Sequence, residues 1–423
     1  MLDISILREH KNEIILALSK RGLDAKALVD QVIEADQKRR SLQAELDQNL
    51  ARANTLAKEI GQLYSSGKTE QAQGLKDETS KLKAENKNLQ AQLNQAVEDL
   101  QTLRYNIPNV PHNLVPNGQS EEDNQEVFQS GKIPDLQEDA LPHWELASKY
   151  NLINFDLGNK ISGAGFPVYT GKGARLQRAL IHYFLDQNTA VGYEEVQVPH
   201  LVNEASGFGT GQLPDKEGQM YHVGADNLYL IPTAEVPVTN LYRDVMLSHE
   251  QLPISNTGYT PCFRREAGSY GAHVRGLNRL HQFDKVEIVR LEHPDRSYDA
   301  LDEMVGHVKT LLEALELPYR VLRLCGGDLG FTSALTYDFE VYSTAQKRWL
   351  EVSSVSNFES FQSTRLKLRF KDKDGRKKWV HTLNGSALAL PRVLAALLEN
   401  NQTDRGIHIP KALVPYTGFK LID

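Results

Sequence analysis

Arginines, an aromatic ring and carboxylates recur at short spacing in Pro261–Val289 (PCFRREAGSYGAHVRGLNRLHQFDKVEIV). Arg264 and Glu266 are two residues apart, so on the strand expected here they would share one face. A guanidinium has the planar fork that grips a phosphate through paired hydrogen bonds. The alternative is a surface salt bridge, and for these two residues taken alone it is the favoured interpretation.

A polar, glycine-bearing segment, Ala267–Asn278, follows, and its length predicts a long hairpin loop. The segment RLHQFDKVE then predicts a returning strand. Its alternate residues would share one face: Arg279, His281, Phe283, Lys285 and Glu287. Such a face is poorly suited to a core, but it suits the floor of a pocket for a triphosphate, a flat base and an ammonium group.

Two further stretches carry polar groups that could complete such a pocket. In IPTAEVP, Thr233 and Glu235 are expected on one face of a strand; the alternative is a sheet edge with an exposed glutamate. In LEVSSVSNF the polar side chains are those of Glu351, Ser353, Ser354 and Asn357. Hard oxygen ligands suit magnesium beside phosphates, although a polar loop is the favoured interpretation of this stretch alone.

The stretch HTLNGSALALPRVLAALLENNQ predicts a strand, a polar step at Asn384-Gly385-Ser386 and a helix beginning near Pro391. Arg392 falls in the first turn of that helix, where its charge opposes the preference of the helix dipole for anions. It therefore needs an anionic partner, which is either a bound phosphate or a nearby carboxylate.

The elements that must position these residues fall into two unlike parts. From about Leu28 to Leu103 apolar residues follow a seven-residue repeat, interrupted at YSSGKTE, where Gly67 predicts a turn and Thr69 a helix N-cap. This pattern predicts an antiparallel coiled-coil hairpin within residues 1–105. A coiled coil most often dimerises or acts as a spacer, so the hairpin alone does not indicate nucleic-acid binding.

Residues 106–142, rich in Pro, Asn and acidic residues, are interpreted as a linker. Residues 143–423 predict an α+β domain in which an antiparallel sheet is flanked by helices, beginning with GKGARLQRALIHYFLDQNTA as a helix. The sequence has no dinucleotide-binding or P-loop glycine motif, and no His or Cys spacing typical of a metal cluster.

Composition limits the class of protein. The net charge of −7 excludes a generally basic nucleic-acid binder, so any such contact must be local. The two cysteines, Cys262 and Cys325, form no disulfide framework, and the N-terminal stretch has no signal-peptide or membrane-span pattern. We therefore expect a cytoplasmic protein without a membrane partner.

Together these stretches resemble the bacterial-type seryl-tRNA synthetases, which are class II aminoacyl-tRNA synthetases. VGYEEVQVP, ending at Pro199, is similar to the first class motif, Pro261–Val289 to the second and TLNGSALALPRVLAALLENNQ to the third. PTAE and EVSSVSN resemble more family-specific signatures, and the likeness includes the hairpin. Ala387 and Pro391 depart from the usual glycines of the third motif, and Arg265 from the usual small residue of the second.

The resemblance implies a homodimer that activates L-serine with ATP, aided by Mg²⁺, and transfers it to serine tRNA and, in many members, selenocysteine tRNA. The implied catalytic residues are Arg264, Arg392 and Glu351. The implied ATP-binding residues are Arg264, Arg265, Glu266, Arg279, Phe283, Glu351, Val352, Ser353, Ser354 and Arg392. The implied serine-binding residues are Thr233, Ala234, Glu235, Arg264, Glu287, Asn384 and Ser386, and the implied magnesium ligands are Glu351 and Ser354.

Two alternatives remain open at this point. One is a class II relative that activates another small amino acid; the tRNA-binding hairpin argues against it. The other is a non-catalytic coiled-coil scaffold or tRNA-binding paralogue; the complete set of arginines expected at the phosphates argues against it.

Overall fold

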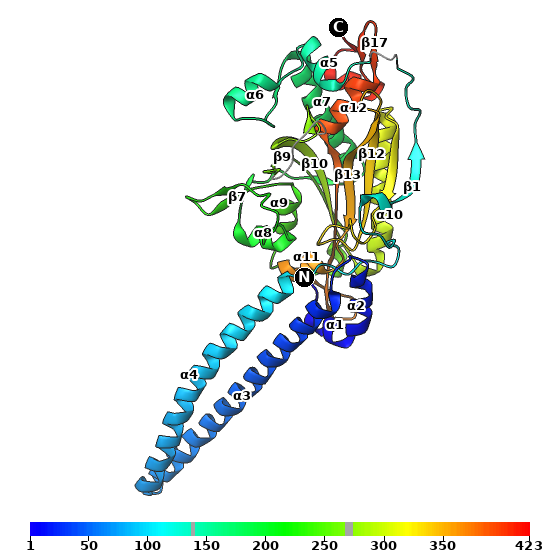
Figure 1. Cartoon of the computed structure of the whole chain (residues 1–423). Coiled ribbons are helices and arrows are strands. Elements are labelled where there is room, and N and C mark those ends of the chain that lie inside the picture. Colours follow the sequence, from blue (N-terminus) through cyan, green and yellow to red (C-terminus); the bar gives the residue numbers. More distant parts are fainter. Residues whose placement is uncertain (137–139, 267–273) are drawn as a thin grey trace. The chain divides into compact units, whose positions relative to one another are not determined.

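The computed structural model describes residues 1–136, 140–266 and 274–423, which form two compact units (Figure 1). One unit comprises Leu2–Ser19 and Leu23–Pro108, and the other comprises Met1, Lys20–Gly22 and Asn109–Asp423. Most of the long hairpin loop predicted at Ala267–Asn278 lies outside the described residues, as does part of the predicted linker.

The first unit is helical and consists of α1 (Ile4–Glu9), α2 (Lys11–Ser19), α3 (Ala25–Ser65) and α4 (Thr69–Tyr105). Helices α3 and α4 pack side by side as the predicted antiparallel hairpin (Figure 1). Gly67, with φ +76°, lies between them and confirms the predicted turn. The prediction that Thr69 caps α4 is wrong: Thr69 is the first helical residue, and Lys68 holds the cap position without a side-chain hydrogen bond.

The two long helices are joined along an apolar seam. Leu46, Leu89 and Leu93 form a buried cluster, and an ion pair of 3.0 Å joins Arg52 to Glu78 across the helices. At the base of the hairpin, α1 and α2 pack against α3. The residues buried there include Leu7, Leu18, Val29 and Val32, so the base has its own small core.

The second unit is built on an eight-stranded sheet. Its strands, in spatial order, are β1 (Gln125–Ser130), β11 (Tyr319–Arg323), β12 (Leu335–Ser343), β13 (Arg348–Asn357), β16 (His381–Ala389), β10 (Gln282–Glu292), β9 (Ile254–Phe263) and β4 (Glu194–Glu195). Neighbouring strands are antiparallel except β4, which runs parallel to β9. This confirms the predicted antiparallel sheet.

Three long helices pack on this sheet: α7 (Gly171–Ala190), α10 (Ser297–Ala314) and α12 (Leu390–Asn400). Helix α7 has the bounds predicted for it. Helix α12 has Pro391 in its first turn, where a missing N–H costs nothing because that group has no partner within the helix.

Strand β10 separates two environments because successive side chains point to opposite faces. Val286 and Ile288 lie in the main apolar core. Val289, on the other face, packs with Ala234 and Val238 of the segment that leads into and forms α9 (Glu235–Asn240). Glu287 is on this second face, with the residues of the candidate site.

The remaining elements of the second unit are short. The strands are β2 (Ile153–Asn154), β3 (Val168–Tyr169), β5 (Leu201–Asn203), β6 (His222–Val223), β7 (Leu228–Leu230), β8 (Met246–Ser248), β14 (Arg369–Lys371), β15 (Lys377–Trp379), β17 (Gln402–Thr403), β18 (Gly406–His408) and β19 (Leu421–Ile422). The α-helices are α5 (His143–Lys149), α6 (Phe155–Ile161), α8 (Glu204–Thr210), α11 (Phe361–Leu366) and α13 (Val414–Thr417). The 3₁₀ turns are η1 (Glu121–Asp123), η2 (His249–Gln251), η4 (Pro294–Arg296) and η5 (Lys411–Leu413).

Two regions differ from the sequence-based expectation. The stretch predicted as a linker contributes β1, which pairs with β11 at the edge of the large sheet. VGYEEVQVPHLV, which includes the first motif, has the pattern of a single strand, but only Glu194–Glu195 joins the large sheet, and the next strand, β5, belongs to a different one. Among the described helices, none has the length and apolar character needed to cross a membrane.

Candidate active site

Charged side chains are buried on the second face of β10. Lys285 and Glu287 are only 6% and 2% exposed, and their Nζ and Oε2 atoms lie 2.5 Å apart. Phe283 is half-buried on the same strand face, so the predicted alternation is confirmed for Phe283, Lys285 and Glu287. It is wrong for Arg279 and His281, because β10 begins only at Gln282. A buried ion pair needs further hydrogen bonds, because burial removes the water that solvates each charge.

Thr233 supplies one of these hydrogen bonds. Its Oγ1 accepts from Lys285 Nζ at 2.7 Å and donates to Glu287 Oε2 at 3.0 Å. The strand predicted for Thr233 and Glu235 is wrong: Glu235 is the first residue of helix α9, and Thr233 precedes that helix in a bend. The helical turn nevertheless buries both side chains near Glu287.

Glu235 is a second buried carboxylate. Its Oε1 accepts a hydrogen bond of 2.5 Å from Gln362 Nε2, and Gln362 in turn accepts from Thr382 Oγ1 at 2.7 Å. Burial raises the pKa of Glu235 to about 7, and the negative charge of Glu287 acts in the same direction. The two carboxylates therefore differ in surroundings: Glu287 forms an ion pair with a lysine, whereas Glu235 accepts hydrogen bonds from neutral amides.

Strand β16 lines the same face. Ser386 pairs with Glu287 and Asn384 with Val289 across the β10–β16 ladder, so both side chains lie on the face of the buried ion pair. The predicted polar step at Asn384–Ser386 does not interrupt this strand. Asn384 Nδ2 is buried and makes no hydrogen bond of ordinary geometry to the described residues.

The arginines of the second motif lie beyond the end of β9. Arg264 stacks over Phe283 with 5.3 Å between its Cζ and the ring centroid. Glu266 adopts φ +48° and pairs with Arg279 Nε at 2.6 Å. The shared strand face predicted for Arg264 and Glu266 is therefore wrong, because β9 ends at Phe263.

The two adjacent arginines are held differently. The backbone N–H of Arg265 donates to Gln219 O at 2.8 Å, which fixes the backbone but leaves the Arg265 side chain at the surface. The Arg264 side chain is only partly exposed, and its Nε donates to Pro232 O at 3.4 Å. Of the two, only Arg264 is therefore directed toward the buried polar residues.

Arg392 has the partners that its position in α12 requires. Its Nε donates to Asn278 O at 3.0 Å and its Nη1 to Glu351 O at 2.8 Å. The Glu351 carboxylate is 3.7 Å from Nη1 and forms a long ion pair with it. Of the two anionic partners that the sequence allowed for Arg392, this structure therefore has the nearby carboxylate. About a third of the Arg392 side chain is exposed, which leaves part of the guanidinium accessible to an anion.

A bulge in β13 brings oxygen ligands together. Ser354 pairs with Asp338 and Glu351 with Glu340, while the register shifts by one residue between these pairs. The extra residue, Val352, places Glu351 and Ser354 on one face although they are three apart. The Ser354 hydroxyl donates to Asp338.

Asp338 is a candidate that the sequence analysis missed. Burial raises its pKa well above the usual range, and the negative charge of Glu351 adds to this effect. Nothing in the run LTYDFEVYS distinguishes this aspartate; only its pairing with Ser354 does. Lys285 was also absent from the predicted site residues. It lies two residues before Glu287 on the same predicted strand face, and this spacing could have identified it.

Three predicted site residues do not offer their side chains to an open site. Ala234 and Val352 are buried, and the Ser353 hydroxyl donates to Ser386 O at 2.6 Å. Any contact of these residues with a ligand would have to come from the backbone.

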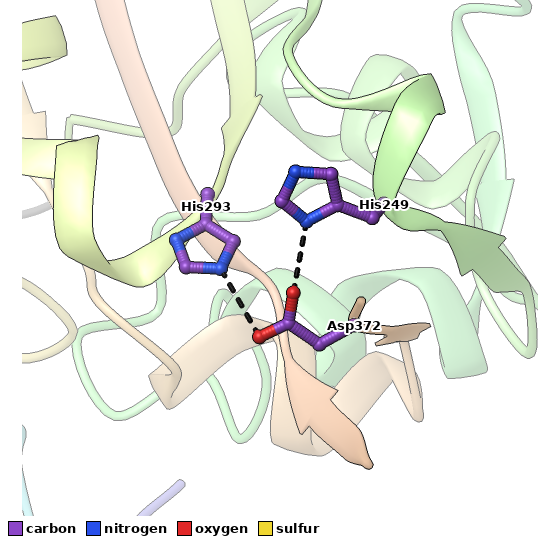
Figure 2. Close-up of side chains that lie close together, drawn as sticks. All are labelled: His249, His293 and Asp372. Atoms are coloured by element: carbon purple, nitrogen blue, oxygen red, sulfur yellow. Dashed lines mark hydrogen bonds and ion pairs between the residues drawn. The ribbon is translucent and has the colours of Figure 1, made fainter. Parts of the chain in front are cut away.

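A separate cluster joins three elements outside this site. Figure 2 shows His249 and His293 directed at the Asp372 carboxylate, with His249 Nδ1 at 2.9 Å and His293 Nε2 at 3.5 Å. No spacing of these residues in the sequence indicated a metal-ligand set. The Lys378 ammonium lies 2.5 Å from the same carboxylate and holds the pKa of Asp372 below its usual range. A cation would have to displace that ammonium, so we interpret the cluster as an ion-paired brace.

The structure also describes a cavity of about 590 Å³, away from the candidate site. Its lining residues come mainly from α7 and the first motif: Tyr169, Ala174, Gln177, Arg178, Ile181, His182, Leu185, Asp186, Glu195, Gln197 and Tyr259. Tyr169 Oη and Gln177 Oε1 are buried without a hydrogen-bond partner among the described residues.

The antiparallel sheet with its three motifs, and the arginines beside a cluster of buried polar side chains, define a class II aminoacyl-tRNA synthetase. Two family models match the chain: the tRNA synthetase class II core domain (G, H, P, S and T) over residues 221–401, and the seryl-tRNA synthetase N-terminal domain over residues 1–111.

Full-length relatives narrow this class. The chain is 49% identical to a serine–tRNA ligase of Salinibacter ruber, covering 100% of this chain and 99% of the relative. It is 45% identical to that of Neisseria gonorrhoeae, covering 99% and 98%. The structure matches the seryl-tRNA synthetase of Pyrococcus horikoshii, complexed with ATP, with a TM-score of 0.93, 32% identity and coverage of 100% and 99%. The chain belongs to the seryl-tRNA synthetase family, and its activity is that of a serine–tRNA ligase.

Proposed function

We propose that serine is activated on the second face of β10 and β16, between the arginines and the buried carboxylates. The observation that carries this proposal is the joint placement of Arg264 over Phe283 and of Thr233 against the Lys285–Glu287 pair. One end of the site presents a cation and a flat ring, and the other presents buried carboxylates. ATP and serine have the complementary features.

The nucleotide end is assigned to the second and third motifs. Phe283 stacks on the adenine and Glu266 contacts it, while Arg264 neutralises the α-phosphate and the serine carboxylate. Arg279 and Arg392 hold the γ end of the triphosphate. The Pyrococcus horikoshii relative was solved with ATP, which supports ATP as the nucleotide. Since Glu266 pairs with Arg279 in this structure, nucleotide binding would have to exchange that ion pair for ligand contacts.

The chemical step needs positioning rather than a protein nucleophile. The serine carboxylate attacks the α-phosphorus in line, forming seryl-adenylate and releasing pyrophosphate. The arginines lower the repulsion between the attacking carboxylate and the phosphates. In the second step the 3′-terminal hydroxyl of serine tRNA attacks the adenylate carbonyl, and AMP leaves.

The amino-acid end is assigned to the buried carboxylates. Glu287 and Thr233 hold the ammonium group, and Glu235, Asn384 and Ser386 face the side-chain hydroxyl. Lys285 already binds the same two oxygens of Glu287 and Thr233, so serine must share or displace that contact. A pocket of this kind discriminates against alanine, because its buried polar groups would be left unpaired.

The donor set around Glu351 fits Mg²⁺. Carboxylate and hydroxyl oxygens of Glu351, Ser354 and Asp338 share one face of the sheet. Burial raises the pKa of Asp338, the negative charge of Glu351 adds to this effect, and a cation would relieve the repulsion between the two carboxyl groups. We assign Glu351 and Ser354 as the residues that would hold the ion, with Asp338 beside them. A bound Mg²⁺ would neutralise phosphate charge.

We propose further that the chain acts in the cytoplasm as a homodimer, with serine tRNA, and selenocysteine tRNA where present, as its nucleic-acid partners. We place the second subunit at the cavity of about 590 Å³ between α7 and the first motif. The match of residues 1–111 to the seryl-tRNA synthetase N-terminal domain supports the hairpin as the tRNA-binding part.

Amino-acid-dependent pyrophosphate exchange tests the proposed site. We expect exchange with serine, and much weaker exchange with alanine, threonine or glycine at equal concentration. The variant Arg264→Ala should fold and lose exchange. A folded Arg264→Ala protein with near-normal exchange would rule out the role proposed for this arginine.

A further inference from the structure

His143 and Glu399 form a fully buried pair outside the proposed contacts with ATP and serine. Both side chains are 0% exposed, and His143 Nδ1 lies 2.7 Å from Glu399 Oε1. His143 begins α5, and Glu399 lies near the end of α12. Such a buried pair is costly unless every polar atom is satisfied, so its bonding partners indicate its role.

The partners of His143 fix its tautomer. Its Nε2 accepts a hydrogen bond of 2.8 Å from the backbone N–H of Leu277. Nε2 must therefore be unprotonated, and the ring proton is on Nδ1, which donates to Glu399. Leu277 belongs to the described C-terminal part of the predicted second-motif loop. The imidazole thus links α12, through Glu399, to the backbone of that part of the loop.

The pair belongs to a closed ring of hydrogen bonds. Gln346 Nε2 donates to Glu399 Oε1 at 2.9 Å, and Gln346 Oε1 accepts from Asn278 Nδ2 at 3.0 Å. Asn278 is bonded to Leu277 along the chain, and Leu277 returns to His143. Ser343 also donates to Glu399. We name Glu399, His143, Leu277, Asn278 and Gln346 the loop-root ring.

The loop-root ring is tightly packed. Gly276 has φ +69°, and a Cβ added there would lie 2.3 Å from His143 Nε2. The residue after His143, Trp144, stacks under Arg275 with 4.9 Å from Cζ to the ring centroid. Residues 275–277 therefore pack against His143 and Trp144 of α5, and Asn278 is held by Gln346 and Arg392.

The ring leads directly to the proposed triphosphate site. The backbone carbonyl of Asn278 accepts from Arg392 Nε at 3.0 Å, and Arg279 is the next residue in the chain. Arg392 and Glu399 are seven residues apart on α12, so two helical turns join the phosphate arginine to the buried end of the ring.

We propose that His143 and Glu399 are positioning residues for the triphosphate-binding arginines. Through the Leu277 N–H they fix Asn278. Asn278 in turn fixes the guanidinium of Arg392, through its backbone carbonyl, and the backbone of Arg279, which is the next residue. The inference rests on the proposed roles of Arg279 and Arg392. It concerns ATP alone, because the residues assigned to serine lie on other segments.

Two substitutions separate the two hydrogen bonds of the imidazole. In His143→Asn the amide nitrogen can replace Nδ1 and donate to Glu399, but no atom reaches Leu277. In His143→Gln the amide oxygen can reach the Leu277 N–H, but the donor to Glu399 is displaced. His307→Asn is the matched control: His307 Nε2 is hydrogen-bonded to Asn188 Oδ1 at 2.7 Å, outside the ring.

The assay is serine-dependent pyrophosphate exchange, with the KM for ATP and the KM for serine measured separately. We expect His143→Asn to raise the ATP KM by roughly two- to tenfold, the range for one lost hydrogen bond, with an unchanged serine KM. His143→Gln should lie closer to wild type, and His307→Asn should change neither KM. An unchanged ATP KM in a folded His143→Asn protein, or an equal rise in both KM values, would overturn the inference.

Asn278→Ala tests the same ring if His143→Asn does not fold. It removes the hydrogen bond to Gln346 and should also raise the ATP KM alone; an unchanged ATP KM would overturn the inference. Arg392→Ala separates this inference from the proposed function. If Arg392→Ala leaves the ATP KM unchanged, the proposed role of Arg392 fails. If it raises the ATP KM while His143→Asn and Asn278→Ala do not, only the loop-root ring fails as a positioning device.

Discussion

Lys285 and Glu287 are opposite charges in a pocket proposed to bind an ammonium group. In this structure the lysine and Thr233 satisfy the glutamate. A substrate ammonium that enters the pocket therefore meets oxygens already ordered for a cation. The cost of ordering these groups has been met during folding rather than during binding.

Replacing Glu287 by glutamine should weaken serine much more than ATP. A charge-assisted hydrogen bond contributes about 1.5–3 kcal/mol, so we expect the serine KM to rise roughly tenfold to a hundredfold. Steady-state pyrophosphate exchange measures both KM values. Glu303→Gln is the control, since Glu303 also pairs with a cation, Arg290, but its side chain is 65% exposed. A wild-type serine KM in Glu287→Gln would show that another group holds the ammonium.

Glu235 predicts a dependence of stability on pH. Its pKa of about 7 in the folded protein exceeds the usual carboxyl value, so the folded state binds the proton more tightly than the unfolded state. The resulting stabilisation is fully present below about pH 4 and is lost as pH rises through 7. Glutamine carries no charge at any pH, so Glu235→Gln avoids this loss of stability. The substitution should raise the free energy of unfolding at pH 8 by at most about 3 kcal/mol.

Urea unfolding at pH 5 and pH 8 checks this expectation. The gain of Glu235→Gln over the unsubstituted protein should be larger at pH 8 than at pH 5. An equal difference at the two pH values would mean that Glu235 is ionised with an ordinary pKa in the folded protein.

At the scale of elements, long periodic segments could be predicted and short irregular ones could not. Helix α7 has its predicted bounds because twenty residues of amphipathic pattern lie between flanking breaks. The run Thr233–Glu235 predicted a strand, but three residues are too few to distinguish the alternation of a strand from one turn of a helix. The tertiary burial of Val236 and Val238, which selects the helix, is not visible in so short a run.

The candidate site was predictable in residue type more than in geometry. The alternation along β10 located Phe283, Lys285 and Glu287 on one face. The bulge at Val352 was not predictable, because it depends on the register with β12, and Asp338 joins the site only through that register. The connection from Glu399 through His143 to Leu277 joins segments distant in sequence, so spacing carried no signal for it.

Gly276 tests the packing of an element against its neighbour. Gly276→Ala would place a methyl group against His143, in addition to the strain of a side chain at φ +69°. We expect a lower melting temperature and a raised ATP KM. Gly375→Ala is the matched control, because Gly375 has φ +80° but no atom within 4 Å of the added Cβ. Its backbone strain of about 1 kcal/mol should lower the melting temperature slightly and leave the ATP KM unchanged. Equal ATP KM values in the two variants would contradict the expected contact with His143.

At the scale of the whole molecule, two compact units share one chain. The predicted site residues all belong to the unit that contains Asn109–Asp423. The base of the hairpin is buried against α1 and α2, so removing all of Leu28–Leu103 would expose Leu7 and Leu18. A deletion that tests the hairpin must therefore keep its base.

Removing residues 48–87 and joining the helices by a short glycine linker keeps the seam contact of Leu46 with Leu89. Serine-dependent pyrophosphate exchange should persist at the wild-type rate, because the deleted residues belong to the other unit. Charging of serine tRNA should collapse, which an aminoacylation assay with labelled serine measures. Wild-type charging by the truncated protein would show that the outer hairpin is a spacer. Loss of both activities would show that the units depend on one another.

The buried imidazole of His143 also gives the protein an internal reporter. The proton on Nδ1 is enclosed between two side chains without solvent exposure, so its exchange with water requires local opening of the structure. In a proton NMR spectrum such a ring proton should persist where solvent-exposed imidazole protons are lost to exchange, and His143→Asn would identify it. Adding ATP should then shift this one resonance, so that events at the phosphates could be observed from the interior of the fold without any attached label.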